Sequence, residues 1–241
     1  LINVPVMTWT LNHMTDEWNF YTLPTYTGNV NDFDDTIPMI PNGRGFALEM
    51  SEDYLLVGSH DSKPHRYLQL WTKTSSPEWS WSWTANDPCP GNYFGFANAI
   101  DGSVIKDAND GVFGVFATGD PGAFFSGRVY VYFSYSPAYH QVLHFGNGTE
   151  NEIACFGYSV SADNGWLAIG APQKLYSSTN HAGMVYIYKW NPATGPQGEY
   201  EFAYQIPPPT PVENGGFGQS VSVSNTVLII GDIKRNAYHY K

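Results

Sequence analysis

Short segments with a period of two run along most of the chain. β-Branched and aromatic residues recur at every second position in residues 129–133 (Val-Tyr-Val-Tyr-Phe), 185–188 (Val-Tyr-Ile-Tyr) and 79–83 (Trp-Ser-Trp-Ser-Trp). This is the period of a β-strand, whose successive side chains point to opposite faces of a sheet. Turn signals such as Asp-Asn-Gly at 163–165 separate these segments, and no stretch has a convincing helical period. The pattern predicts an all-β chain.

An internal repeat organises these strands. Two glycines lie thirteen residues apart in three segments that align without gaps: Gly45 and Gly58, Gly157 and Gly170, and Gly218 and Gly231. A fourth copy runs from Phe94-Gly95 to Gly119 and carries eleven extra residues. An aromatic-rich strand follows each copy, at residues 67–71, 129–133, 185–190 and 237–240. Repeats of this length predict β-propeller blades, because a lone sheet cannot bury both of its faces.

Each repeat reads as a four-stranded antiparallel blade. The first strand opens at the Phe-Gly pair, a tight turn leads into the second strand, and that strand ends at a corner such as Gly170-Ala171-Pro172. Two longer outer strands follow. We expect the phenylalanine to wedge between blades, and the glycines to permit close backbone approach or positive φ.

One copy carries a resemblance to a known family. Phe-Gly-Tyr-Ser-Val at 156–160, Leu-Ala-Ile-Gly-Ala-Pro at 167–172 and Gly-Met-Val-Tyr-Ile-Tyr at 183–188 resemble the FG-GAP repeat of integrin α-subunit-like β-propellers. The copy at 217–231 keeps Phe-Gly-Gln-Ser-Val but lacks Ala-Pro, and the copy at 45–58 has Arg-Gly in place of Phe-Gly. With the outer strands included, the resemblance covers nearly the whole chain and implies a propeller of four-stranded antiparallel blades.

The repeats divide the chain as one propeller domain, residues 1–241. We expect the outer strands of a partial blade in 1–44, and a second partial blade in 217–241. The full blades are 45–93, 94–155 and 156–216. This gives about four to five blades, whereas FG-GAP propellers commonly have seven. Either the terminal pieces close a small ring, which would remove sheet edges and is the favoured alternative, or the chain is a portion of a larger seven-bladed ring.

Composition and charge exclude several classes of protein. The chain has 11 Lys and Arg against 22 Asp and Glu, a formal net charge of −11. Its few cations are scattered, so binding to nucleic acid or to an anionic membrane is not expected. No stretch approaches eighteen consecutive apolar residues, so direct insertion into a membrane is not expected either. At 42% hydrophobic residues the chain can form a core, which excludes disorder.

The extra residues of the second repeat are the candidate metal site. In integrin-like propellers the matching hairpin binds calcium, and the resemblance implies Asp101, Asp107, Asn109 and Asp110 as oxygen ligands. The spacing is one residue short of the family's Asp-x-Asp-x-Asp-Gly pattern, and Lys106 adds a positive charge. A solvated hairpin without metal is the alternative.

Three further features bear on the surface of the protein. Trp79, Trp81 and Trp83 are expected on one face of an outer strand, either as a stacking platform for a glycan or as packing between blades. Cys89 and Cys155 both precede a first strand and could bridge two blade linkers. Asn147 begins an Asn-Gly-Thr sequon, which is compatible with glycosylation and secretion.

The function follows mainly from the resemblance. No nucleophile or zinc motif occurs, and Glu49 is the only carboxylate expected on a first strand, which argues against a catalytic channel. FG-GAP propellers are mostly extracellular or surface-exposed recognition scaffolds. The resemblance therefore implies a non-enzymatic scaffold that binds a protein or glycan, or a structural subunit that assembles with its own copies. The alternatives are a carbohydrate-active enzyme (a polysaccharide lyase or hydrolase) and a lectin.

Overall fold

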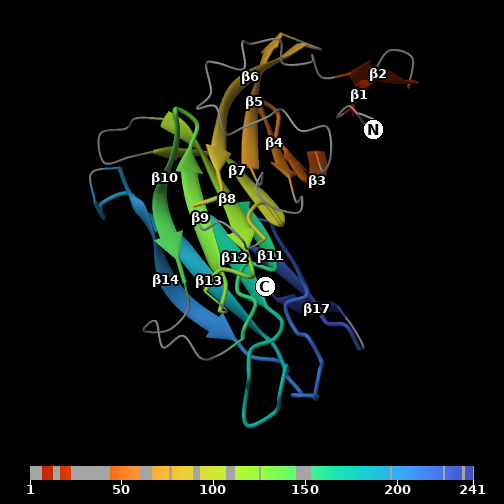
Figure 1. The fold of residues 1–241 in the computed structure, drawn as a ribbon, viewed down its shortest axis with the longest axis vertical. Coiled ribbons are helices and arrows are strands. Elements are labelled where there is room, and N and C mark those ends of the chain that lie inside the picture. The colour runs from red at the N-terminus through yellow and green to blue at the C-terminus, as the bar shows by residue number, and fades with distance from the viewer. Residues whose placement is uncertain are drawn as a thin grey trace.

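A computed structural model describes most of the repeat region and two short N-terminal segments. The described residues are 7–12, 17–22, 44–59, 67–75, 78–88, 93–106, 112–124, 126–144, 153–195, 197–224, 226–234 and 237–240. Within them every regular element is a strand, seventeen in all, which confirms the all-β prediction (Figure 1). No helix in this part of the chain is long and apolar enough to cross a membrane.

The strands form five antiparallel sheets, each continuous in the sequence. An N-terminal hairpin pairs β1 (Met7–Asn12) with β2 (Glu17–Thr22). Sheet 1 contains β3 (Arg44–Met50), β4 (Tyr54–Ser59), β5 (Tyr67–Ser75) and β6 (Glu78–Asn86). Sheet 2 contains β7 (Ala97–Lys106), β8 (Val112–Asp120), β9 (Arg128–Phe133) and β10 (Ser136–Leu143). Sheet 3 contains β11 (Ser159–Asp163), β12 (Trp166–Ala171), β13 (Met184–Asn191) and β14 (Glu199–Ile206). Sheet 4 contains β15 (Ser220–Ser224), β16 (Val227–Gly231) and β17 (Ala237–Tyr240).

The first strands of the four sheets bring consecutive repeats together. β3 contacts β7, β7 contacts β11, and β11 contacts β15, so the sheets follow one another in chain order (Figure 1). The expected strand pattern of three complete repeats and one partial repeat is therefore confirmed. Sheets stacked in this way are consistent with propeller-like blades.

Close contact between glycines joins each sheet to the next. The second glycine of a repeat lies against the backbone carbonyl of the Phe-Gly glycine in the following repeat, where a Cβ atom would overlap that oxygen. The pairs are Gly58 with Gly95, Gly119 with Gly157, and Gly170 with Gly218. The second member of each pair has a positive φ, of 81°, 88° and 89° respectively. Both expected roles of the glycines, close approach and positive φ, are confirmed.

The phenylalanines of the repeat are buried at the same junctions. Phe94, Phe156 and Phe217 are at most 1% exposed. The N–H of Phe156 donates to the carbonyl of Ser126 in the preceding sheet, at 2.8 Å. The ring of Phe156 packs edge-on against Tyr186 of its own sheet, with centroids 5.4 Å apart. The wedge predicted from the repeat is therefore present.

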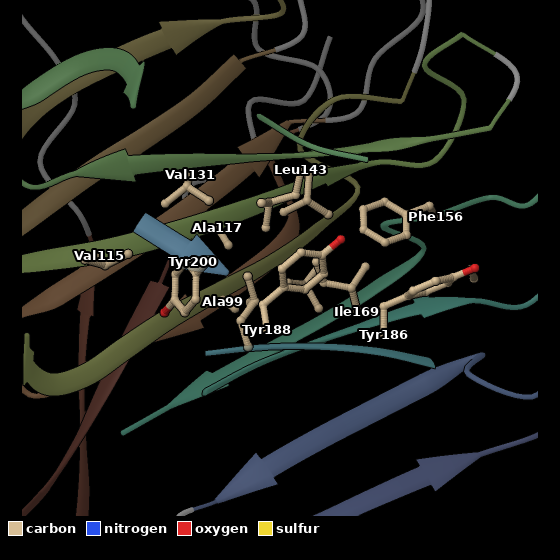
Figure 2. Packing of buried hydrophobic residues seen from close by; sticks show 14 of the residues in the cluster. Ala99, Val115, Ala117, Val131, Leu143, Phe156, Ile169, Tyr186, Tyr188 and Tyr200 are labelled. Atoms are coloured by element: carbon tan, nitrogen blue, oxygen red, sulfur yellow. The ribbon is translucent and has the colours of Figure 1, made fainter. Parts of the chain in front are cut away.

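The largest apolar cluster lies between sheets 2 and 3. Val131 and Leu143 from sheet 2 meet Ile169, Tyr188 and the outer-strand residue Tyr200 from sheet 3, and Figure 2 shows their side chains facing one another. Burying apolar area in this way contributes roughly 25 cal/mol per Å² to stability. The two sheets therefore share one packed core.

Candidate functional site

The three tryptophans of the expected glycan platform do not share one face. Leu70 pairs with Trp83, but the next residue, Trp71, pairs with Trp81, so a β-bulge lies between the two tryptophans on β6. A bulge inserts one residue and reverses the alternation of side chains beyond it. Trp79 and Trp81 pack with Trp71, whereas Trp83 packs toward sheet 2. The expectation of a single tryptophan face is wrong for this reason.

Two of these tryptophans serve in packing within and between sheets. Trp79 and Trp83 are buried, and Trp81 is half-buried. The indole N–H of Trp83 donates to the Ser134 carbonyl of sheet 2 at 2.9 Å, and its ring lies 5.6 Å from the ring of Tyr132. Trp83 therefore ties sheet 1 to sheet 2. Glycan binding at the tryptophans stays a prediction, and Trp81 is the one whose ring is partly accessible.

Asp101 is buried between sheets 2 and 3. Its Oδ2 atom accepts a hydrogen bond from the backbone N–H of Gly165 at 2.7 Å and one from the Tyr200 hydroxyl at 3.4 Å. Burial, and the nearby Asp101 carboxylate, raise the pKa of Tyr200 well above its usual range. The residue proposed as a calcium ligand thus holds the hairpin turn of the next sheet. Asp107, Asn109 and Asp110 lie outside the described residues, so the calcium site stays a prediction.

Carboxylates on the first strands are more numerous than the sequence indicated. Glu49 lies on β3 as expected, but Asp101 lies on β7 and Asp163 on β11. The strand β7 extends to Lys106 because the longer hairpin continues its pairing past an irregularity after Asp101. The expectation that Glu49 is the sole such carboxylate is therefore wrong. Within the described ranges, no three His, Cys, Asp or Glu side chains gather closely enough to hold a metal ion.

The remaining candidate residues are only partly described. Cys155 is half-buried with a positive φ of 53°, and burial raises the pKa of its thiol. Cys89 lies outside the described residues, as does the sequon residue Asn147. Both the bridge and the glycosylation stay predictions.

Exposed aromatic rings occur on the outer strands, a feature that the repeat analysis missed. Tyr139 on β10 is 49% exposed, and Phe202 and Tyr204 on β14 are 56% and 49% exposed. A bulge in the pairing of β13 with β14 sets Phe202 opposite Tyr188 and Tyr204 opposite Ile187, so the two rings lie on different faces of sheet 3. The alternating aromatics of residues 200–204 were the available signal, but alternation alone does not show which ring is covered.

Two hollows lie on the two faces of sheet 3. An apolar groove of about 400 Å³ separates it from sheet 4, which has three strands where sheets 1 to 3 have four, and Ile187, Tyr204 and Leu228 line this groove. The opposite hollow, which we term the loop cavity, has a volume of about 560 Å³. The residues that line it are His144, Lys174, Leu175, Tyr176, Ser177, Met184, Tyr186, Tyr188, Phe202 and Gln205.

Comparison with known proteins gives no further assignment. No protein-family model matches the chain, and no curated protein matches it in sequence. The FG-GAP resemblance therefore rests on the motif residues and on the repeated antiparallel sheets.

Proposed function

We propose that the protein is a non-enzymatic recognition scaffold, an extracellular or surface-exposed FG-GAP-like propeller that binds a protein or glycan partner. The observation that carries this proposal is the set of exposed aromatic rings on the outer strands, Tyr139, Phe202 and Tyr204. Aromatic side chains supply much of the binding energy at protein and sugar contacts, so exposed rings are suited to hold a partner.

The joined sheets support a scaffold role. Backbone contacts at Gly119 and Gly157, and at Gly170 and Gly218, fix adjacent sheets at close range. A rigid support holds surface groups in place, so little conformational entropy is lost on binding. The test is a panel of polysaccharides and cell-surface proteins incubated with the dialysed protein. We expect retention of a partner without new reducing or unsaturated sugar ends. Release of such ends would support the alternative, a carbohydrate-active enzyme, and would overturn the proposal.

The calcium and ring-closure predictions belong to the same proposal. We propose that calcium binds the hairpin of β7 and β8, and that the terminal strands complete one composite blade. Native mass measured with calcium and again with EDTA tests the closure. A monomer near 26.8 kDa in both conditions is expected. A defined oligomer would overturn closure within one chain and favour a structural subunit. A rise in Tm on adding calcium is expected from the metal site, and its absence would overturn that site.

A further inference from the structure

One aromatic side chain occupies the same place on the outer strand of each four-stranded sheet. These outer strands, β6, β10 and β14, form an edge of sheets 1, 2 and 3 (Figure 1). In each sheet an aromatic residue of the third strand pairs with an aromatic residue of the outer strand, and the extra residue of a β-bulge follows at once. The outer-strand residues, which we term the rim rings, are Trp81, Tyr139 and Phe202. A bulge that recurs three times with an aromatic residue beside it is a feature of the repeat.

The bulges also tie each outer strand to the following sheet. Beyond the bulge, the outer strand presents its next paired side chain to the opposite face. There the indole N–H of Trp83 donates to the Ser134 carbonyl at 2.9 Å. The amide of Gln141 exchanges two hydrogen bonds with the backbone of Tyr200, at 2.8 and 2.9 Å. These bonds hold neighbouring outer strands at a set spacing, which for packed sheets is about 10 Å or more.

Each rim ring is supported by its own sheet and keeps part of its surface accessible. Tyr139 packs edge-on against Tyr130 with centroids 5.6 Å apart, and Phe202 packs in the same way against Tyr188 at 5.8 Å. Tyr139 and Phe202 are 49% and 56% exposed, and Trp81 is half-buried. A supported ring loses little freedom on binding, and its open surface can stack on the apolar face of a sugar ring.

Repetition and charge together indicate the class of ligand. Equivalent rings one sheet apart suit a linear polymer, because its equal units can occupy several rings at once and each bound unit raises the effective concentration of the next. The chain has a net charge of −11, and the exposed Glu201 directly precedes Phe202, so an anionic polymer would be repelled. A neutral polysaccharide meets both conditions.

We propose that the rim rings bind one linear neutral polysaccharide, which crosses from sheet to sheet along the outer strands. Each ring stacks on one sugar unit, and the units between them span the distance to the next ring. The inference rests on the proposed recognition function. It names the class of partner for two of the recognition rings, Tyr139 and Phe202, and adds Trp81 to them.

Calorimetric titration with soluble neutral polysaccharides (β-glucan, xylan, glucomannan and dextran) tests the inference, and each polymer is compared with a disaccharide of the same sugar. We expect at least one polymer to bind about a hundredfold or more tightly than its disaccharide, because it occupies several rings together. Tyr139→Ala, Phe202→Ala and Trp81→Ala should each weaken binding of the polymer by about tenfold or more.

Two aromatic residues outside the outer strands supply matched controls. Tyr93 and Phe124 are 46% and 42% exposed, so Tyr93→Ala and Phe124→Ala should bind the polymer like the wild type. Equal Tm values would show that the variants are folded. If Trp81→Ala is unstable, the variants of the two exposed rim rings, Tyr139→Ala and Phe202→Ala, still decide the result.

Three results would overturn the polysaccharide inference. These are no binding of any neutral polymer, equal affinity for a polymer and its disaccharide, and equal losses in the rim-ring and control variants. If the protein then retains a protein partner through Tyr139 and Phe202, the recognition function stands and only the class of partner is wrong. If it retains no partner of any kind, the recognition function fails as well.

Discussion

The carbonyl oxygen of Gly157 occupies the space where a side chain on Gly119 would stand. The same relationship recurs between Gly95 and Gly58 and between Gly218 and Gly170, at each of the three junctions between sheets. A backbone carbonyl cannot rotate aside as a side chain can. The two-glycine spacing of the repeat is therefore a requirement of packing between sheets.

Substitution of Gly119 should destabilise the fold strongly. Gly119→Ala places a methyl group against fixed backbone, so we expect a loss of about 3 kcal/mol or more in the free energy of unfolding, the upper end of overpacking costs. Gly114→Ala on the same strand is the control, because its Cβ would meet ring atoms of Phe116 and Tyr54 at 2.9 Å. This overlap is milder than the one at Gly119 and involves side-chain atoms instead of a backbone carbonyl, so a smaller loss is expected. Urea denaturation compares them, and equal losses would contradict the packing account.

Asp101 should contribute to stability without any metal. Asp101→Ala leaves the buried N–H of Gly165 without this acceptor, at a cost of about 1–3 kcal/mol. Tyr200→Phe removes only the longer hydrogen bond of 3.4 Å and should cost less. Denaturation in EDTA measures both variants. If Asp101→Ala lost stability only when calcium was present, the hydrogen-bonding role would be refuted.

The bulge in β6 predicts unequal effects at two neighbouring tryptophans. Trp83→Ala removes a buried ring and its hydrogen bond to Ser134, so a loss of about 3–5 kcal/mol is expected. Trp81 is half-buried, and Trp81→Ala should cost clearly less. Thermal and urea unfolding of the two variants give the comparison. A larger loss at Trp81 would contradict the assignment of Trp83 to the contact with sheet 2.

Buried tyrosines should make the fold sensitive to alkali. Burial raises the pKa of Tyr188 from 10.0 to about 12, and burial followed by repulsion from Tyr130 raises that of Tyr132 further. Because the pKa of Tyr188 is higher in the folded state than in the unfolded state, its neutral phenol contributes fully to stability below pH 10. This stabilisation is lost as the pH rises from 10 toward 12. For Tyr188 this amounts to roughly 3 kcal/mol.

The absorbance of the phenolate measured against pH tests this sensitivity. The buried tyrosines Tyr132 and Tyr188 should titrate together with unfolding, above pH 10. Tyr188→Phe should weaken the dependence of stability on pH. Titration of Tyr132 and Tyr188 near pH 10 with the fold intact would disprove the burial argument.

The repeat itself could be predicted from the sequence. Phe-Gly pairs and glycines at a constant spacing indicate a local conformation that few other residues adopt, and β-formers at every second position indicate the strands. The strand β17 has the predicted bounds, Ala237–Tyr240. Local patterns of this kind depend on residues close together in the chain, so they can be predicted from a single sequence.

The side-chain environments could not be predicted in the same way. The bulge between Trp81 and Trp83 depends on pairing with β5, and the burial of Asp101 depends on the turn at Gly165 and on Tyr200 in the next sheet. The loop cavity likewise joins His144 of one repeat to Phe202 of another. Contacts between residues so distant in sequence leave no periodic signal in a single chain.

The proposed recognition function depends on the aromatic rings of the outer strands, and partner affinity tests that claim most directly. Binding of the retained partner should be measured for the wild type and for the double variant Tyr139→Ala/Phe202→Ala. The matched control is Tyr93→Ala/Phe124→Ala, which removes two other rings that are 46% and 42% exposed. We predict that the outer-strand variant loses at least tenfold in affinity and that the control binds like the wild type. Full affinity in the outer-strand variant would contradict the account.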